Sequence, residues 1–196
     1  MIQWIGSKYG GWHIDLDKIP AGSTVISAGL GNDISFDEAL IKIKKCNVIG
    51  IDPTNLTKKT IDKKQPLKKF TLIRKVLYIG GRPSITTADT NGASIYDSKQ
   101  KTTVESITLK DIVKGYRDIS VLKMNIEGAE YDILLNTDKL TIPQVLVRFH
   151  HRKENVPFAY QNTIDCINKM QGFGYKYLPQ NNPKNTKVDY EVLFTL

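Results

Sequence analysis

The stretch from Val25 to Leu40 reads VISAGLGNDISFDEAL and decides the fold. Its first residues are apolar and β-branched, which predicts a buried strand over 24–28. Gly29 and Gly31 mark a tight turn. The residues after the turn predict a helix over roughly 34–45, with the apolar positions Ile34, Leu40, Ile41 and Ile43. A strand, a glycine turn and a helix together form one unit of an α/β fold.

The rest of the chain repeats this alternation of apolar runs and amphipathic stretches. Further strands are predicted over 47–51, 70–79, 102–107, 121–126 and 144–150, and further helices over 54–64, 108–116, 129–135 and 158–170. Residues 83–101 are rich in turn-forming residues and predict a loop with one short strand at most. The last two strands, 175–178 and 188–196, follow each other without a helix and are expected to pair antiparallel. We therefore expect a doubly wound, mostly parallel seven-stranded sheet with a C-terminal antiparallel hairpin.

Length and composition limit the class of protein. The chain has 196 residues, of which 40% are hydrophobic and 24% charged, which suits one folded domain over residues 1–196 and excludes a disordered chain. No apolar run approaches the roughly 18 residues of a membrane helix, and Met1-Ile2-Gln3-Trp4 is not the start of a signal peptide. Cys46 and Cys166 have no partner at metal-ligand spacing, so we expect two reduced thiols in a cytoplasmic protein.

The chain is basic, with a net charge of +8 at pH 7. Eight Lys and Arg residues lie between Lys58 and Lys75, against one acid, Asp62. Such a cluster is either a solvated surface or a site that binds an anionic partner such as nucleic acid. The sequence leaves both interpretations open.

The residues that follow the first two predicted strands favour a nucleoside ligand. Ligands of doubly wound sheets bind at the carboxyl ends of the strands. Gly29 and Gly31 allow a ligand to approach the backbone, but the third glycine of the dinucleotide motif is replaced by Ile34. Asp52 follows the second strand, where a carboxylate can accept both ribose hydroxyls. A nucleoside without a pyrophosphate, such as S-adenosylmethionine, fits this combination.

Polar side chains also follow the predicted strands 121–126 and 144–150. Glu127 and Glu130 are three residues apart and share a face if a helix begins near Gly128, or they are first-turn acids that interact favourably with the helix dipole. His150 and His151 are neighbours, so at most one of them is expected to face the cleft directly. A neutral imidazole there suits removal of a proton from a hydroxyl.

Several segments together resemble the FkbM-type S-adenosylmethionine-dependent methyltransferases. Besides VISAGLGNDISFDEAL, the matching segments are YGGW (9–12), GIDPT (50–54), SITL (106–109), VLKMNIEGAEYDIL (121–134) and FHHR (149–152). They occur in the order of the family and extend over most of the chain. The resemblance implies a class I methyltransferase (Rossmann-like) fold and methyl transfer to oxygen, commonly on hydroxyls of sugars and natural products, with S-adenosylhomocysteine as the product.

The resemblance also assigns roles to individual residues. The methionine end of the cofactor would lie at Gly29, Gly31, Asn32 and Asp33, the ribose at Asp52 and Pro53, and the adenine near the loop at Ala93 and Ser94. Asn125 and Glu127 would line the methyl-transfer site, and His150 or His151 would face the acceptor and take its proton. Glu127 is the alternative base, and Asn125 would hold the acceptor.

Two positions depart from the family pattern. Asn125 stands where the family has Asp, and Arg148 stands where it has Glu. Related sugar methyltransferases use acids at such strand ends to hold a divalent ion, which lowers the pKa of the acceptor hydroxyl. Two lost negative charges and a gained positive charge weaken a site for a hard cation. Asn125 can still offer one neutral oxygen, and if Arg148 points into the flank of the sheet the metal question stays open. We assign no metal ligands and expect that a divalent metal is not required.

These observations lead to one main hypothesis and two alternatives. The main hypothesis is a carbohydrate O-methyltransferase that transfers methyl in line to a sugar hydroxyl of a glycan or glycoconjugate, as one domain of a larger glycan-modifying protein. The first alternative is an RNA methyltransferase that uses the Lys58–Lys75 cluster. The second is a non-catalytic nucleoside-binding module, which Asn125 and Arg148 would suit. The sequence does not fix the acceptor or the oligomeric state.

Overall fold

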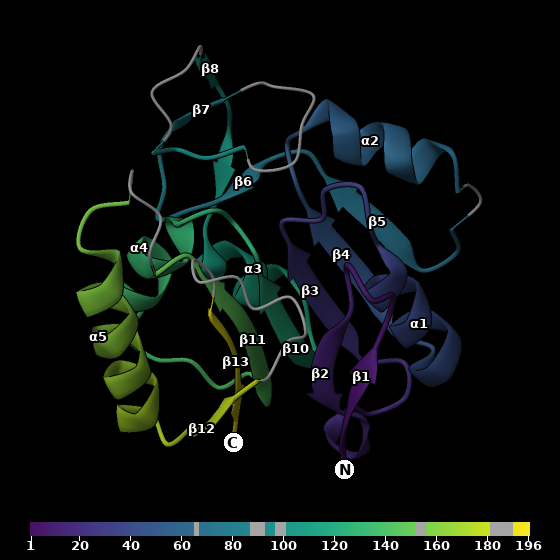
Figure 1. Ribbon diagram of the computed structural model, residues 1–196. Coiled ribbons are helices and arrows are strands. Elements are labelled where there is room, and N and C mark those ends of the chain that lie inside the picture. Colours follow the sequence, from purple (N-terminus) through teal and green to yellow (C-terminus); the bar gives the residue numbers. More distant parts are fainter. Residues whose placement is uncertain (65–66, 87–92, 97–100, 152–155, 181–189) are drawn as a thin grey trace.

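A seven-stranded sheet crosses the molecule in the order β12-β13-β11-β10-β3-β4-β5 (Figure 1). The computed structural model describes residues 1–64, 67–86, 93–96, 101–151, 156–180 and 190–196. The five strands from β11 to β5 are parallel, and β13 is antiparallel to both β11 and β12. The expected mostly parallel sheet with a C-terminal antiparallel pair is confirmed. The strands are β3 (Thr24–Ala28), β4 (Asn47–Ile51), β5 (Phe70–Ile73), β10 (Ile119–Met124), β11 (Gln144–Phe149), β12 (Lys176–Pro179) and β13 (Tyr190–Thr195).

Helices cover both faces of this sheet (Figure 1). On one face lie α3 (Leu109–Gly115), α4 (Ala129–Leu135) and α5 (Ala159–Gly172), whose apolar residues share one core cluster with the sheet. On the other face lie α1 (Ser35–Lys44) and a hairpin of β1 (Ile2–Ile5) and β2 (Trp12–Asp15), followed by the short 3-10 helix η1 (Leu16–Lys18). The helix α2 (Asn55–Asp62) packs through Ile61 against a third cluster beside the carboxyl end of β3.

The helix α1 shows how local sequence directs this packing. Phe36 and Leu40, four residues apart, are buried against the sheet, while Ile43 is 50% exposed. Acidic residues occupy the first turn and basic residues the last, which complements the helix dipole. The helix ends at Lys45, which adopts a left-handed conformation and donates its N–H to Ile41. The sequence therefore predicted this helix to within a residue, although Ile43 does not join the core.

Two predicted strands are each divided between different sheets. The run 70–79 was expected to be one strand, but only β5 joins the central sheet, and β6 (Val76–Leu77) pairs in parallel with β9 (Ser106–Ile107). Between them Lys75 N–H donates to Ile73 O, which turns the chain away from β4. Likewise 102–107 divides into β8 (Lys101–Thr103), which pairs with β7 (Ser84–Thr86), and β9. Both small sheets lie beyond the carboxyl edge of the central sheet (Figure 1).

The cysteines, the search for membrane helices and the N-terminal hairpin complete the comparison with the sequence. Cys46 and Cys166 are free and buried, as expected. In the part of the chain that the structure describes, no helix is long and apolar enough to cross a membrane. The β1–β2 hairpin was not predicted. The Asn- and Pro-rich turn between the last two strands lies outside the described residues, as do parts of the 83–101 loop.

We predict that Leu40→Ala destabilises the fold by about 2–5 kcal/mol, because it removes a fully buried side chain from the contact between α1 and the sheet. Ile43→Ala on the same helix removes the same kind of apolar side chain from an exposed position. It is expected to change stability by less than about 0.5 kcal/mol. Urea unfolding of both variants measures the difference, and equal losses would contradict this packing of α1.

Candidate active site

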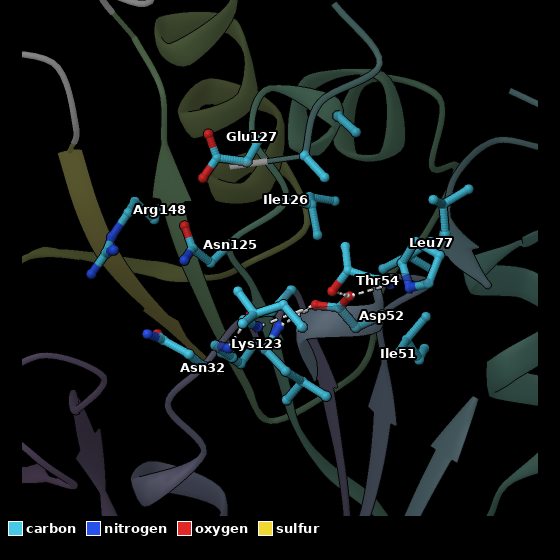
Figure 2. Close-up of a pocket in the computed structure, with 18 of the residues that line it drawn as sticks. Asn32, Ile51, Asp52, Thr54, Leu77, Lys123, Asn125, Ile126, Glu127 and Arg148 are labelled. Atoms are coloured by element: carbon cyan, nitrogen blue, oxygen red, sulfur yellow. Dashed lines mark hydrogen bonds between the residues drawn. The ribbon is translucent and has the colours of Figure 1, made fainter. Parts of the chain in front are cut away.

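A pocket of about 260 Å³ opens at the carboxyl ends of β3, β4, β10 and β11 (Figure 2). The loops that follow these strands supply most of its lining, as doubly wound sheets predict. The rest comes from the N-terminal hairpin, the two small sheets, the segment 93–96, the strands themselves and the first turns of α2 and α4. The lining includes Tyr9, Gly10, Trp12, Gly29, Gly31, Asn32, Asp33, Asp52, Pro53, Thr54, Leu77, Ile85, Ala93, Ile95, Lys123, Asn125, Glu127, Arg148 and His150. Every candidate residue from the sequence is among them except Ser94 and His151.

Gly29 forms the floor of the pocket. Its φ of 75° is in the left-handed region, and a Cβ atom there would lie 1.9 Å from the carbonyl oxygen of Asn125. Its N–H donates to Ile51 O at 3.0 Å, and its carbonyl accepts from Lys123 Nζ at 2.7 Å. Any side chain at this position would push β3 and the loop after β10 apart, so only glycine fits.

The Asp52 carboxylate holds the glycine loop in place. One oxygen accepts from Leu30 N–H at 2.9 Å and from Gly31 N–H at 3.2 Å. The other accepts from the N–H and the hydroxyl of Thr54, at 2.9 and 2.7 Å. The side chain lies in the centre of the pocket, and the residue is 5% exposed (Figure 2). Asp52 therefore connects the end of β3 to the start of α2.

Asp33 ties the N-terminal hairpin to the start of α1. Its carboxylate accepts from Ser35 N–H at 2.9 Å and from Ser7 Oγ at 2.5 Å. Burial alone would raise the pKa of Asp33, but the hydrogen bonds from Ser35 and Ser7 outweigh burial and lower it. The charged carboxylate thereby fixes the loop that brings Tyr9 and Gly10 to the pocket.

One end of the pocket is apolar. Ile51 and Leu77 lie on this side of the pocket in Figure 2. Ile85, Ala93 and Ile95 are further apolar residues of the lining. Ser94 lies between two of these residues, but its hydroxyl donates to Glu127 O at 2.8 Å and accepts from Tyr96 N–H. Its role in the structure is therefore to hold the loop against the residues that follow β10.

The other end carries charged groups around Trp12. Lys123 Nζ lies 5.7 Å and the Arg148 guanidinium carbon 5.3 Å from the centre of the indole ring. Arg148 also donates from Nε to Glu191 Oε1 at 2.8 Å, and from Nη2 to the same oxygen. Asn125 lies beside Arg148 (Figure 2). Neither Trp12 nor Lys123 was predicted to line the site, although a lysine inside an otherwise apolar buried strand is a recognisable signal.

Glu127, His150 and Glu130 form a row that leads from the pocket into the core. Glu130 is fully buried and accepts from both Nδ1 and the N–H of His150, at 2.7 and 3.1 Å. His150 Nε2 lies 3.5 Å from a carboxylate oxygen of Glu127, which is partly exposed. Burial opposes a charge on His150, but the carboxylates of Glu130 and Glu127 outweigh burial and raise its pKa to about 10. The raised pKa favours the imidazolium form of His150 at neutral pH, whereas removal of a proton by His150 would need the neutral imidazole.

His151 lies outside the pocket. Its ring packs 5.7 Å from that of Tyr190 and 6.5 Å from that of Tyr160, between centroids. Of the two neighbouring histidines the structure therefore brings only His150 to the candidate site.

The residues at the strand ends do not form a site for a hard cation. Asn125 offers one neutral oxygen, and Arg148 brings a positive charge to the same edge. Among the described residues, no group of three or more His, Cys, Asp or Glu side chains is arranged to hold a metal ion.

Comparisons with known proteins agree with this architecture. In fold, the chain is similar to a proposed rRNA methylase from Clostridium thermocellum, with a TM-score of 0.51, 12% identity, and 90% of this chain and 88% of that one covered. It also matches a methyltransferase from Pyrococcus furiosus (TM-score 0.41, 10% identity, 92% and 78% covered) and M. jannaschii TYW2 in complex with AdoMet (0.40, 12%, 98% and 84%). No curated protein sequence matches.

The family assignment rests on a sequence comparison. The model of the methyltransferase FkbM domain matches residues 18–177, which include the glycine loop, Asp52, Asn125, Glu127 and both histidines. The match covers most of the chain, and the Clostridium thermocellum structure shares the fold. The chain therefore belongs to the FkbM family of S-adenosylmethionine-dependent methyltransferases.

Proposed function

We propose that this domain transfers a methyl group from S-adenosylmethionine to a hydroxyl group of a sugar. The observation that carries the proposal is the order of groups along one pocket. An apolar end, a central carboxylate (Asp52) and a polar end follow one another, and Glu127 lies beside the polar end (Figure 2). An adenine, a ribose and an amino-acid group would match these three parts in the same order.

The residues present fit this cofactor. Leu77 and Ile85 would pack against the adenine, and the glycine loop with Asn32 and Asp33 would border the methionine end. Asp52 would accept from the ribose hydroxyls beside Pro53. Its oxygens already accept four protein hydrogen bonds, about as many as a carboxylate can accept. We infer that the Thr54 hydroxyl, which also lies 3.1 Å from Thr57 Oγ1, turns to that partner when ribose binds.

The cofactor supplies an electrophilic methyl group on a sulfonium, so the protein mainly positions the acceptor and removes its proton. Because the pKa of His150 is raised to about 10, this residue is already protonated and is a poor base. Glu127 is partly exposed, lies at the pocket and faces His150. We assign Glu127 as the base: the acceptor oxygen forms the new C–O bond, the S–C bond breaks, and the proton moves to a Glu127 oxygen.

His150 and Glu130 position that carboxylate. The buried Glu130 fixes the orientation of the imidazole ring through Nδ1. Asn125 would hold the acceptor or the methionine end, since both are close to its side chain in this arrangement.

We infer the class of acceptor from the residues at the pocket and not from the net positive charge of the chain. An RNA methyltransferase is the alternative that the Lys58–Lys75 cluster suggests. Among the described residues of the cluster, Lys58, Lys64 and Lys75 form ion pairs with Asp62, Glu38 and Glu105. These pairs reduce the positive charge that the cluster offers to phosphates. A small polar acceptor beside Glu127 therefore remains the better explanation.

We predict micromolar binding of S-adenosylmethionine and S-adenosylhomocysteine that depends on Asp52 and does not change with EDTA or added magnesium. Asp52→Asn is expected to weaken binding at least about tenfold, because the carboxylate accepts from ribose. Isothermal calorimetry measures both affinities. Asp62→Asn on α2 changes the net charge equally and is exposed, so its affinity is expected to match that of the wild type.

Asp52 holds the glycine loop and is also proposed to bind the ribose. The 2′-deoxy analogue of S-adenosylhomocysteine distinguishes these two roles. The wild type is expected to bind this analogue more weakly than the parent, and Asp52→Asn is expected to bind the two alike. Equal binding by the wild type would contradict the ribose assignment. No binding of either parent ligand would remove the methyltransferase proposal.

We predict that sugar hydroxyls, and not RNA, are methylated. A panel of methyl glycosides and a synthetic RNA hairpin are offered in turn, and the release of S-adenosylhomocysteine is measured. Methylated RNA, with binding that falls steeply between low and high salt, would favour the RNA alternative instead. Cofactor binding without methylation of any hydroxyl would favour a non-catalytic nucleoside-binding module.

We predict that Glu127→Gln lowers kcat on the identified acceptor by about 10²- to 10⁴-fold, because the amide cannot take the proton. Its affinity for S-adenosylhomocysteine is expected to stay within threefold of the wild type. His151→Ala is the matched control, since its ring lies outside the pocket, and it is expected to lose less than threefold in kcat. A full rate in Glu127→Gln would exclude Glu127 as the base.

The protonation state of His150 tests the assignment of Glu127 as the base, and this test needs no acceptor substrate. The pKa of His150 is raised from 6.5 to about 10, so the folded state holds this proton at pH values where the unfolded state has lost it. The associated stability is complete below about pH 6.5 and is lost as the pH rises toward 10. NMR of the imidazole nitrogens is expected to show a protonated ring at neutral pH, and Glu130→Gln is expected to lower this pKa. A neutral ring in the wild type would reinstate His150 as the base.

A further inference from the structure

The charged end of the pocket contains the guanidinium of Arg148. The protein fixes its orientation, but not all of its N–H donors have an acceptor among the described residues. Glu191, which is 1% exposed, receives Nε and Nη2 of Arg148, and Trp12 lies against the guanidinium. An arginine has five N–H donors. Within the described residues no group accepts a hydrogen bond from Nη1, and Arg148 lines the pocket. A fixed donor pair therefore remains available to a ligand at this end.

An unpartnered acceptor lies beside this donor. Asn125 Oδ1 is buried and has no hydrogen-bond partner among the described residues. A buried polar atom without a partner is costly, which marks a place that a bound group completes. Figure 2 shows Asn125 and Arg148 on the same side of the pocket, opposite Ile51 and Leu77. One end of the pocket thus presents a hydrogen-bond acceptor and a guanidinium together.

These two groups complement an α-amino acid. An ammonium would donate to Asn125 Oδ1, and a carboxylate would accept from Arg148 Nη1 in a charge-assisted hydrogen bond. We propose that Arg148, held by Glu191 and Trp12, forms a carboxylate subsite that binds the amino-acid end of the cofactor. This inference rests on the proposed function, because it takes the nucleoside end to lie at Leu77 and Asp52.

The electrostatic surroundings support a carboxylate at this place. Lys123 Nζ lies on the same indole ring and adds a second cation. Burial lowers the pKa of Lys123, although the nearby Asp37 carboxylate opposes that change. Glu191 pairs with Arg148, and Asp37, the carboxyl group whose charge acts on Lys123, is itself buried, which raises its pKa. An incoming carboxylate therefore meets a donor that is already oriented and desolvated, so little further ordering is needed.

The test compares S-adenosylmethionine with decarboxylated S-adenosylmethionine, which keeps the ammonium and lacks only the carboxylate. Calorimetry of the whole chain is expected to show the decarboxylated ligand binding about 10- to 100-fold more weakly to the wild type. The variant Arg148→Gln with Glu191→Gln removes the guanidinium without leaving a buried carboxylate unpaired. It is expected to bind the two ligands with affinities within about threefold of each other.

Two further variants serve as controls. Glu191→Gln alone keeps the guanidinium and is expected to keep the discrimination between the ligands. Lys114→Gln removes one exposed positive charge on α3, away from the pocket, and is expected to leave both affinities unchanged. Thermal unfolding of each variant confirms that it folds. If the double variant is unfolded, Arg148→Lys, which keeps the charge and loses the planar donor pair, is expected to reduce the discrimination.

Each outcome separates this inference from the proposed function. Absence of S-adenosylmethionine binding to the wild type overturns both. Binding of S-adenosylmethionine without discrimination in the wild type, or with full discrimination in the double variant, overturns only the subsite. A carboxylate on the acceptor is the other source of this chemistry, and glucuronate serves as its probe. Glucuronate binding is therefore measured to the S-adenosylhomocysteine complexes of the wild type and the double variant. If the double variant loses glucuronate binding but still discriminates S-adenosylmethionine from its decarboxylated form, Arg148 binds the acceptor instead.

Discussion

The close contact between Gly29 and Asn125 sets the geometry of the pocket. The carbonyl oxygen of Asn125 occupies the space that a Cβ atom of residue 29 would need. Gly29 also bonds to Ile51 at the end of β4 and to Lys123 in β10. Three neighbouring strands therefore end against one glycine. Because their ends are held within a few ångströms, Asp52, Asn125 and Glu127 face one pocket rather than three separate loops.

Buried charges restrict the same region in a second way. An unpaired charge in a protein interior is costly, so each buried ionic group needs a partner from another element. Glu130 in α4 pairs with His150 after β11, and Arg148 in β11 pairs with Glu191 in β13. These pairs join elements that are distant in sequence. They fix the orientation of the side chains that face the pocket. Apolar contacts alone would not supply these charged, directional interactions.

The sequence predicted the parts of the site whose signals are local. A buried β-branched run followed by glycines, and an acid directly after the next strand, place Gly29 and Asp52 without any knowledge of the fold. The division of 70–79 between β5 and β6 could not be predicted, because an apolar run does not show where a strand exchanges one partner for another. The β1–β2 hairpin was missed for a related reason: its four-residue strands pair only with each other.

The protonation of His150 was also beyond the sequence. Spacing alone places Glu130 on the same helix face as Glu127, but not against Nδ1 of a histidine twenty residues later. The role of Arg148 was open for the same reason. In the sequence it is a basic residue within a predicted strand, and the structure shows that it pairs with Glu191, packs on Trp12 and lines the pocket.

The layout of charge in the pocket bears on how the proposed reaction would be accelerated. A negative group near a sulfonium strengthens cofactor binding, but it speeds transfer only if it interacts more strongly with the transition state. During methyl transfer, positive charge moves from the sulfur toward the acceptor oxygen. A carboxylate that lies beside the acceptor, as Glu127 would, gains interaction energy as that charge arrives. In the proposed mechanism His150, whose Nε2 lies 3.5 Å from the Glu127 carboxylate, would hold that carboxylate in place beside the acceptor.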